Sequence, residues 1–98
     1  MLYVIARIEA QPSRFRDVEA AMLELARASR LEAGCIRYDV LADATGNLFV
    51  TREEWLTAED ERAHMGGAAV AAAFAAVRDA LAAAPDILRL GALTVTEA

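Results

Sequence analysis

The sequence predicts a small α+β domain of β-α-β-β-α-β order, the ferredoxin-like arrangement with a four-stranded antiparallel sheet. Strand-like runs near both ends and a hairpin in the middle are separated by two segments of helical periodicity. At 98 residues, without a repeat or linker, the chain has room for one core, so we expect a single domain over residues 1–98. Both helices of such a chain should cover one face of the sheet and leave the other open.

The first strand and the first helix are each marked by their apolar pattern. Residues 2–8 form an apolar run that ends before a Gln11-Pro12-Ser13 break, which is typical of a strand. Ser13 is a plausible N-cap for the helix that follows. Four apolar residues then recur at helical spacing: Phe15, Val18, Met22 and Leu25.

The hairpin has the clearest local signal. We expect Gly34 to stop the first helix as its C′ residue, and residues 35–41 alternate as a strand does. Residues 43–47, Asp-Ala-Thr-Gly-Asn, are turn formers, and residues 48–55 supply the third strand.

The second half of the chain should hold a short helix, a long helix and a last strand. Thr57 followed by acidic residues predicts a helix start, with an end near residues 64–67, His-Met-Gly-Gly. The long helix should run through the alanine-rich stretch to Pro85, with a core stripe of Val70, Phe74, Val77 and Leu81. Residues 87–93 predict the last strand. Residues 94–98 are polar, and we expect them to fray or to reach a neighbouring subunit.

Strand parity divides the sheet residues into two faces. The more apolar set, expected beneath the helices, is Val4, Ala6, Ile8, Ile36, Tyr38, Val40, Phe49, Thr51, Glu53, Trp55, Leu88 and Leu90. The other set carries one arginine per strand, namely Arg7, Arg37, Arg52 and Arg89. Burial of an unpaired charge is costly, so we expect this arginine face to point away from the helices. It is either a solvated surface or the interface of an isologous dimer, with Arg37 or Arg52 paired to Asp39 or Glu54 across the two-fold axis.

Composition excludes several classes of function. The net charge is −5, and the ten arginines are scattered without a basic cluster, so nucleic acid is not an expected partner. Cys35 is the only cysteine, which excludes an internal disulfide and a cysteine-based zinc site and suggests a reducing, cytoplasmic setting. The apolar stretch of residues 68–84 contains Arg78 and Asp79, so no membrane span is expected. The N-terminus lacks the features of a signal peptide.

Three landmarks together carry a family resemblance. They are the segments Glu-Ala-Gly-Cys-Ile-Arg-Tyr at 32–38 and Phe-Val-Thr-Arg-Glu-Glu-Trp at 49–55, and His64 nine residues after the tryptophan. This order and spacing resembles the antibiotic biosynthesis monooxygenase family over nearly the whole chain. The resemblance implies a dimeric α+β barrel with a substrate pocket between each sheet and its helices. It also implies oxygenation of aromatic polyketides or hydroquinones by dioxygen, without metal, flavin or haem. Anthrone oxygenases of this family carry an asparagine where this chain has Thr51.

Two residues are candidates for acid–base chemistry. His64 is the only histidine, and histidine has an unperturbed pKa near neutrality, so it is the first candidate for a base. A packing or surface histidine is the alternative. Glu53 falls on the helix-covered face, where a carboxylate must be paired, protonated or hydrated. It is either a second catalytic group or the partner of an arginine such as Arg62 or Arg78.

Four further residues are candidates for substrate binding. Tyr38 either holds a substrate oxygen or donates to a backbone carbonyl, and Thr51 shares its face of the sheet. Trp55 is either an apolar wall of the pocket or part of the core. Phe74 belongs by default to the core stripe, with pocket lining as a secondary role.

Taken together, the residues and the resemblance predict a cofactor-independent monooxygenase or quinol oxidase that acts with dioxygen on a small aromatic or polyketide-like molecule. We expect a homodimer formed through the sheet. The alternative is a non-catalytic domain that binds a small molecule or senses an effector. A haem-degrading role ranks third, because this chain lacks the asparagine of the first strand and the histidine of the second long helix that such a role requires.

Overall fold

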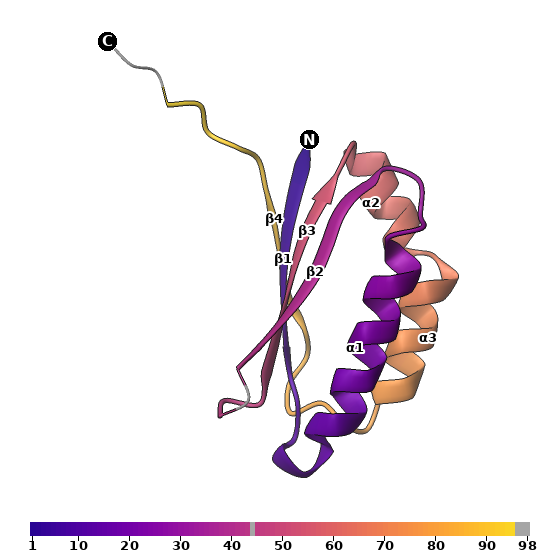
Figure 1. The fold of residues 1–98 in the computed structure, drawn as a ribbon, viewed down its shortest axis with the longest axis vertical. Coiled ribbons are helices and arrows are strands. Elements are labelled where there is room, and N and C mark those ends of the chain that lie inside the picture. Colours follow the sequence, from indigo (N-terminus) through magenta and orange to yellow (C-terminus); the bar gives the residue numbers. More distant parts are fainter. Residues whose placement is uncertain (44, 96–98) are drawn as a thin grey trace.

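The fold was analysed in a computed structural model that describes residues 1–43 and 45–95. Its elements occur in the order β1 (Leu2–Glu9), a 3-10 turn (Pro12–Arg14), α1 (Phe15–Ser29), β2 (Cys35–Asp43), β3 (Leu48–Trp55), α2 (Ala58–Met65), α3 (Ala68–Val77) and β4 (Asp86–Leu90). The four strands form one antiparallel sheet in the order β2-β3-β1-β4 (Figure 1). This architecture confirms the predicted α+β class and the ferredoxin-like order.

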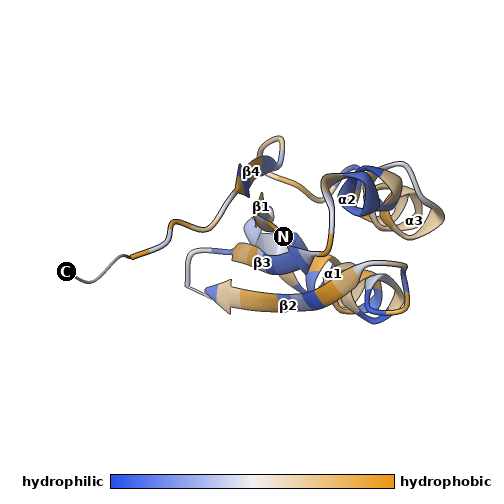
Figure 2. Ribbon diagram, turned by 90° about the horizontal axis from the view of Figure 1, so that it is seen from above, coloured by the Kyte–Doolittle hydropathy of each residue, from blue (hydrophilic) through white to orange (hydrophobic). Residues whose placement is uncertain are grey.

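All three helices lie on the same side of the sheet (Figures 1 and 2). The predicted stripe of α1 is buried at Val18, Met22 and Leu25, and Phe15 stacks on Phe49 of β3 with 4.7 Å between ring centroids. Burial of these apolar side chains against the sheet is the main force that holds the layers together. The helix packs as its periodicity predicts, although a 3-10 turn precedes it and Ser13 does not act as its N-cap.

The hairpin of β2 and β3 confirms the turn prediction for the residues that the structure describes. The Asp43 carboxylate accepts hydrogen bonds from the backbone N–H groups of Thr45 and Gly46 and from the Thr45 hydroxyl. Asn47 has a φ of 54°, which an asparagine adopts more readily than most residues. Ala44, also predicted in this turn, lies outside the described residues.

Gly34 has a different role from the predicted one. α1 already ends at Ser29, with Arg30 as its C-cap, so Gly34 is not the C′ residue. It instead has a φ of +75° in the connection to β2, and a Cβ atom at this position would collide with the side chain of Asp60. Glycine is therefore required here both by the backbone conformation and by the close approach of α2.

The predicted long helix is shorter than expected. α3 ends at Val77, and Leu81, predicted on its core stripe, forms an isolated antiparallel bridge with Ala10. The side-chain Nε2 of Gln11 donates to the backbone carbonyls of Asp79 and Leu81 in the segment that follows the helix. These contacts satisfy two carbonyl groups that lie outside regular helix.

The face assignment of β4 was wrong. Ile87 is paired with Ala6 and Arg89 with Val4, so Ile87 and Arg89 lie on the helix-covered face. Leu88 and Leu90, opposite Ile5 and Tyr3, lie on the open face. Arg89 is accommodated because its Nε and Nη2 donate to the two carboxylate oxygens of the buried Glu61 on α2, at 2.9 and 3.1 Å.

Two more details differ from the predicted sheet. Ile36 is exposed because the register of β2 shifts between Cys35 and Arg37. The last strand ends at Leu90, and residues 91–95 extend away from the domain (Figure 1). Residues 96–98, expected to fray or reach a neighbour, lie outside the described residues. None of the helices in residues 1–43 and 45–95 is both long and apolar enough to cross a membrane.

Candidate active site

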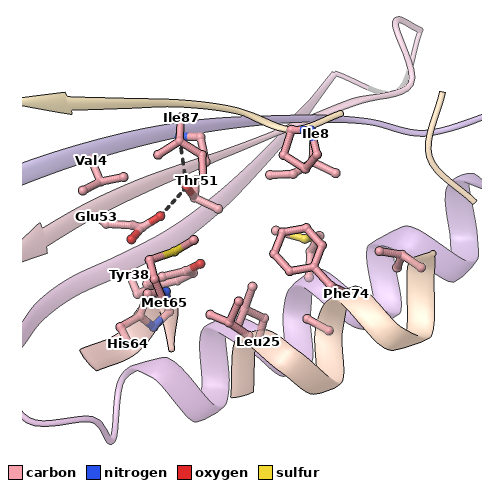
Figure 3. Close-up of a pocket in the computed structure, with 16 residues that line it drawn as sticks. Val4, Ile8, Leu25, Tyr38, Thr51, Glu53, His64, Met65, Phe74 and Ile87 are labelled. Atoms are coloured by element: carbon pink, nitrogen blue, oxygen red, sulfur yellow. Dashed lines mark hydrogen bonds between the residues drawn. The ribbon is translucent and has the colours of Figure 1, made fainter. Parts of the chain in front are cut away.

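A small cavity lies between the sheet and the helices, with a volume of about 40 Å³ (Figure 3). Most of its lining is aliphatic or aromatic. The residues that surround it are Val4, Ala6, Ile8, Met22, Leu25, Tyr38, Thr51, Glu53, His64, Met65, Val70, Ala73, Phe74, Val77, Pro85 and Ile87. Glu53, Tyr38, His64 and Met65 lie together at one end, and Phe74 and Ile8 at the other (Figure 3). The cavity therefore has an apolar body and one polar end.

Glu53 supplies a carboxylate at this polar end. It is only 4% exposed, and β3 directs it toward the helices, as parity predicted. Its oxygens accept hydrogen bonds from the Thr51 hydroxyl at 2.6 Å and from the Trp55 indole N–H at 2.9 Å. Arg62 and Arg78 are both exposed, and neither pairs with Glu53 in the described part of the chain. The predicted arginine partner was wrong, and two uncharged donors take its place.

His64 stands in the last turn of α2 and is 3% exposed. Its Nδ1 lies 2.6 Å from Oε1 of Glu32, which comes from the connection between α1 and β2. The imidazole packs at 4.6 Å from the Trp55 ring and at 5.5 Å from the Tyr38 ring, measured between centroids. A histidine bound to a carboxylate through Nδ1 leaves Nε2 as the nitrogen available for proton transfer.

Tyr38 is buried beside these two groups. Burial, followed by the negative charge of Glu53, raises the pKa of its phenol well above the ordinary value. The hydroxyl therefore stays protonated at any physiological pH and can act as a hydrogen-bond donor. Among the described residues, the Tyr38 hydroxyl forms no hydrogen bond to a backbone carbonyl, which was one of its two predicted roles. The main-chain carbonyl of Tyr38 accepts from Arg30 Nε at 2.9 Å.

The other predicted site residues occupy distinct positions. Thr51 Oγ1 links two strands, since it accepts from the Ala6 N–H at 3.2 Å and donates to Glu53. Phe74 lines the cavity and is 37% exposed, so it borders the solvent. Trp55 is fully buried behind His64 and Glu53 and is absent from the cavity lining within the described residues. It supports the site from the core side.

Sequence reasoning missed two members of the site. Glu32 was noticed only as part of a family landmark, and nothing in its local pattern pointed to His64. Met65 was assigned to a helix end, although its flexible side chain closes one side of the cavity. Within residues 1–43 and 45–95, no group of three or more His, Cys, Asp or Glu side chains is arranged to hold a metal ion.

Comparison of the structure with solved structures finds close matches of the whole fold. A protein from Pseudomonas aeruginosa, PA3566, is 28% identical, with a TM-score of 0.86 and coverage of 95% of this chain and 94% of that one. A candidate antibiotic biosynthesis monooxygenase from Caulobacter crescentus is 27% identical, with a TM-score of 0.86 and coverage of 95% and 90%. A similarly named protein from Nitrosomonas europaea shares the fold. It is 24% identical, with a TM-score of 0.88 and coverage of 96% of this chain and 100% of that one.

Comparison of the sequence gives the family. No curated protein matches the chain significantly. The family model described as "Antibiotic biosynthesis monooxygenase" matches residues 1–86, which include β1 to β3, all three helices, the first residue of β4 and all residues of the cavity except Ile87. The chain therefore belongs to the antibiotic biosynthesis monooxygenase family.

Proposed function

We propose that this protein is a cofactor-independent monooxygenase or quinol oxidase that acts on a small aromatic or polyketide-like molecule bound between the sheet and the helices. The Glu32–His64 pair at the edge of an apolar cavity is the observation that carries the proposal. Membership of a family named for monooxygenases supports the same reaction class.

His64 is the proposed base. Glu32 accepts the Nδ1–H, so Nε2 carries the lone pair that removes a proton from a phenolic or enolic hydroxyl of the substrate. The imidazolium that forms is stabilised by the adjacent carboxylate, as in other histidine–carboxylate pairs. Tyr38, kept neutral by its raised pKa, donates a hydrogen bond to the substrate anion.

The remaining steps require enclosure more than further functional groups. The electron-rich anion transfers one electron to dioxygen, and the resulting radical pair reacts within the apolar cavity. For a monooxygenase, a CH₂ group and O₂ become C=O and H₂O; for a quinol oxidase, the quinol and O₂ become the quinone and H₂O₂. The substrate supplies all electrons in both cases. Thr51 and Phe74 contact the substrate, and Glu53 orients its polar end or accepts a second proton.

Substrate binding must enlarge the cavity. Pockets that hold drug-sized ligands measure about 300 Å³ or more, and the present cavity of about 40 Å³ is far smaller. Met65 and Phe74 are the side chains that can move, because Met65 is unbranched and flexible and Phe74 already borders the solvent.

Oxygen consumption tests the proposal. The wild type should consume dioxygen with at least one member of a panel of anthrones and dihydroxynaphthalenes, above the rate without enzyme. His64→Gln should lower kcat by about 100-fold, the usual contribution of a general base. Glu19→Gln, a change on the exposed face of α1, is the matched control and should leave kcat unchanged. Equal kcat for the wild type and His64→Gln would remove His64 from the mechanism.

We also propose that the protein is a homodimer formed through the open face of the sheet. This face carries Ile5, Leu41, Leu88 and Leu90. It is more apolar than predicted, because β4 contributes Leu88 and Leu90 to it instead of Ile87 and Arg89. Two of its arginines are already paired within one chain, since Asp39 accepts from Arg37 at 2.6 Å and from Arg52 at 3.2 Å. The intersubunit ion pairs that we expected are therefore not needed, and apolar contact drives association.

Sedimentation velocity tests the dimer. The wild type should sediment as a dimer at micromolar concentration, and Leu88→Glu should shift it to a monomer because the carboxylate would be buried in the interface. Leu31→Glu is the control, since Leu31 is 87% exposed outside the sheet. A wild type that is monomeric under these conditions contradicts the proposal.

A non-catalytic binding or effector-sensing role is the second candidate. It is favoured by the internal pairing of the polar groups: Glu53 by Thr51 and Trp55, and His64 by Glu32. Such a site binds a ligand without needing a reactive group. Thermal-shift screening with metabolites distinguishes the two roles, because a sensor would be stabilised by ligands that it does not consume, with no oxygen uptake.

A further inference from the structure

A second hollow adjoins the cavity at Met65. It is an open groove of about 270 Å³ between α2 and β4, lined by Leu2, Ala58, Glu61, Arg62, Met65 and Arg89. Met65 lines both the groove and the cavity, so the two spaces meet at one flexible side chain. Movement of Met65, one of the two side chains that can enlarge the cavity, would widen this meeting point.

The groove differs from the cavity in its charge. Its lining includes two guanidinium groups, from Arg62 and Arg89, and one carboxylate, from Glu61, so it carries a net charge of +1. Arg89 binds Glu61 through Nε and Nη2, which leaves Nη1 free to donate, and its side chain is 46% exposed. Arg62 forms no ion pair in the described part of the chain. The groove thus offers donors from two arginines to an incoming anion.

We infer that the ligand of this protein is an aromatic acid whose ring occupies the cavity and whose carboxylate binds Arg62 and Arg89 in the groove. The inference rests on the proposed function in taking the cavity as the place of the ring. Arg89 is fixed by Glu61 before the ligand arrives, so its remaining N–H groups are already oriented. Arg62, on the exposed face of α2, closes over the carboxylate from the solvent side.

Calorimetric titration tests the inference without relying on turnover. The probes are hydroxylated naphthoic and anthracene carboxylic acids, each compared with its own methyl ester, which keeps the ring and removes the charge. The wild type should bind at least one acid about tenfold more tightly than its ester. Arg62→Gln should remove this tenfold preference and leave ester binding unchanged, and added salt should weaken only the acid.

Arg78→Gln is the matched control, because Arg78 is an exposed arginine that lines neither hollow. Arg62 is also exposed, so its substitution should not compromise folding, whereas Arg89→Gln would leave the buried Glu61 unpaired. Acids that bind no better than their esters, or an equal loss of acid binding in Arg62→Gln and Arg78→Gln, would overturn the inference. Acid binding that depends on Arg62 without any oxygen uptake would uphold it while removing the oxygenase proposal.

Discussion

Glu32 and His64 lie 32 positions apart in the chain, yet Oε1 of Glu32 and Nδ1 of His64 approach to 2.6 Å. Glu32 belongs to the connection that leads into β2, and His64 to the last turn of α2. Their contact joins two segments that no strand pairing brings together. It holds Nδ1 of His64 on a carboxylate, so its removal should affect the proposed proton transfer more than folding.

Glu32→Gln should lower kcat about tenfold or more, with less effect on substrate affinity. Glutamine can still accept the Nδ1–H through its amide oxygen but cannot stabilise an imidazolium by its charge. Steady-state kinetics with the best substrate of the oxygen-uptake panel would measure the effect. Glu24→Gln, which removes only an exposed ion pair with Arg27, is the control. A rise in KM at constant kcat would contradict the proposal that the charge of Glu32 stabilises the imidazolium.

Thr51→Val should destabilise the protein by about 1–3 kcal/mol, the cost of leaving buried polar groups without partners. Valine removes the acceptor of the Ala6 N–H and the donor to Glu53 while preserving the side-chain shape. Thr51→Ser keeps the hydroxyl and loses one methyl group, so it should cost about 1 kcal/mol or less. Urea unfolding of both variants makes the comparison. Equal destabilisation would show that packing, rather than hydrogen bonding, is the role of Thr51.

Gly34→Ala should destabilise the protein by at least about 2 kcal/mol. The left-handed conformation costs a non-glycine residue about 1–2 kcal/mol, and the new Cβ would also meet Asp60. Gly91→Ala is the control, because a Cβ there has nothing within 4 Å. Thermal unfolding should show a clear fall in Tm for the first variant and little change for the second. A neutral Gly34→Ala would mean that the α1–β2 connection adjusts freely.

Tyr38 should make the stability of the protein fall at high pH. Because the pKa of Tyr38 is raised in the folded state, the unfolded chain loses this proton first, above about pH 10. The unfolded state then binds fewer protons than the folded state, so the free energy of unfolding decreases by up to about 1.4 kcal/mol per pH unit.

Urea unfolding at pH 9 and pH 11 would measure this decrease. Tyr38→Phe removes the titrating group, so the variant should lose less stability between the two pH values than the wild type does. Equal decreases in the free energy of unfolding in the two proteins would show that other groups cause the loss of stability at alkaline pH.

Local patterns predicted the parts of the fold that local chemistry determines. The helical stripe of α1, the hairpin and the cap of α2 all follow from residues that act on near neighbours; Thr57, for example, accepts from the Asp60 N–H as expected. The polar residues of β3 were assigned to the correct face because the strand is long enough for parity to be unambiguous.

Features that depend on distant contacts were not predictable in the same way. β4 is short, and each of its two alternating sets of residues contains a large apolar side chain. Only the pairing of β4 with β1 therefore shows that Arg89 faces the helices. The segment that follows α3 is bound by Gln11, which is distant in sequence. Glu32 reaches His64 from a connection without regular structure, and no periodicity extends through such a segment.

Trp55, the only tryptophan of the chain, lies fully buried against the imidazole of His64. Indole emission is sensitive to the charge and distance of a neighbouring imidazole, which quenches it when protonated. Trp55 is thus an intrinsic fluorescent probe beside the polar end of the cavity. Displacement of His64 by a ligand should be visible as a change in intrinsic fluorescence, so that ligand binding could be followed in real time without any label.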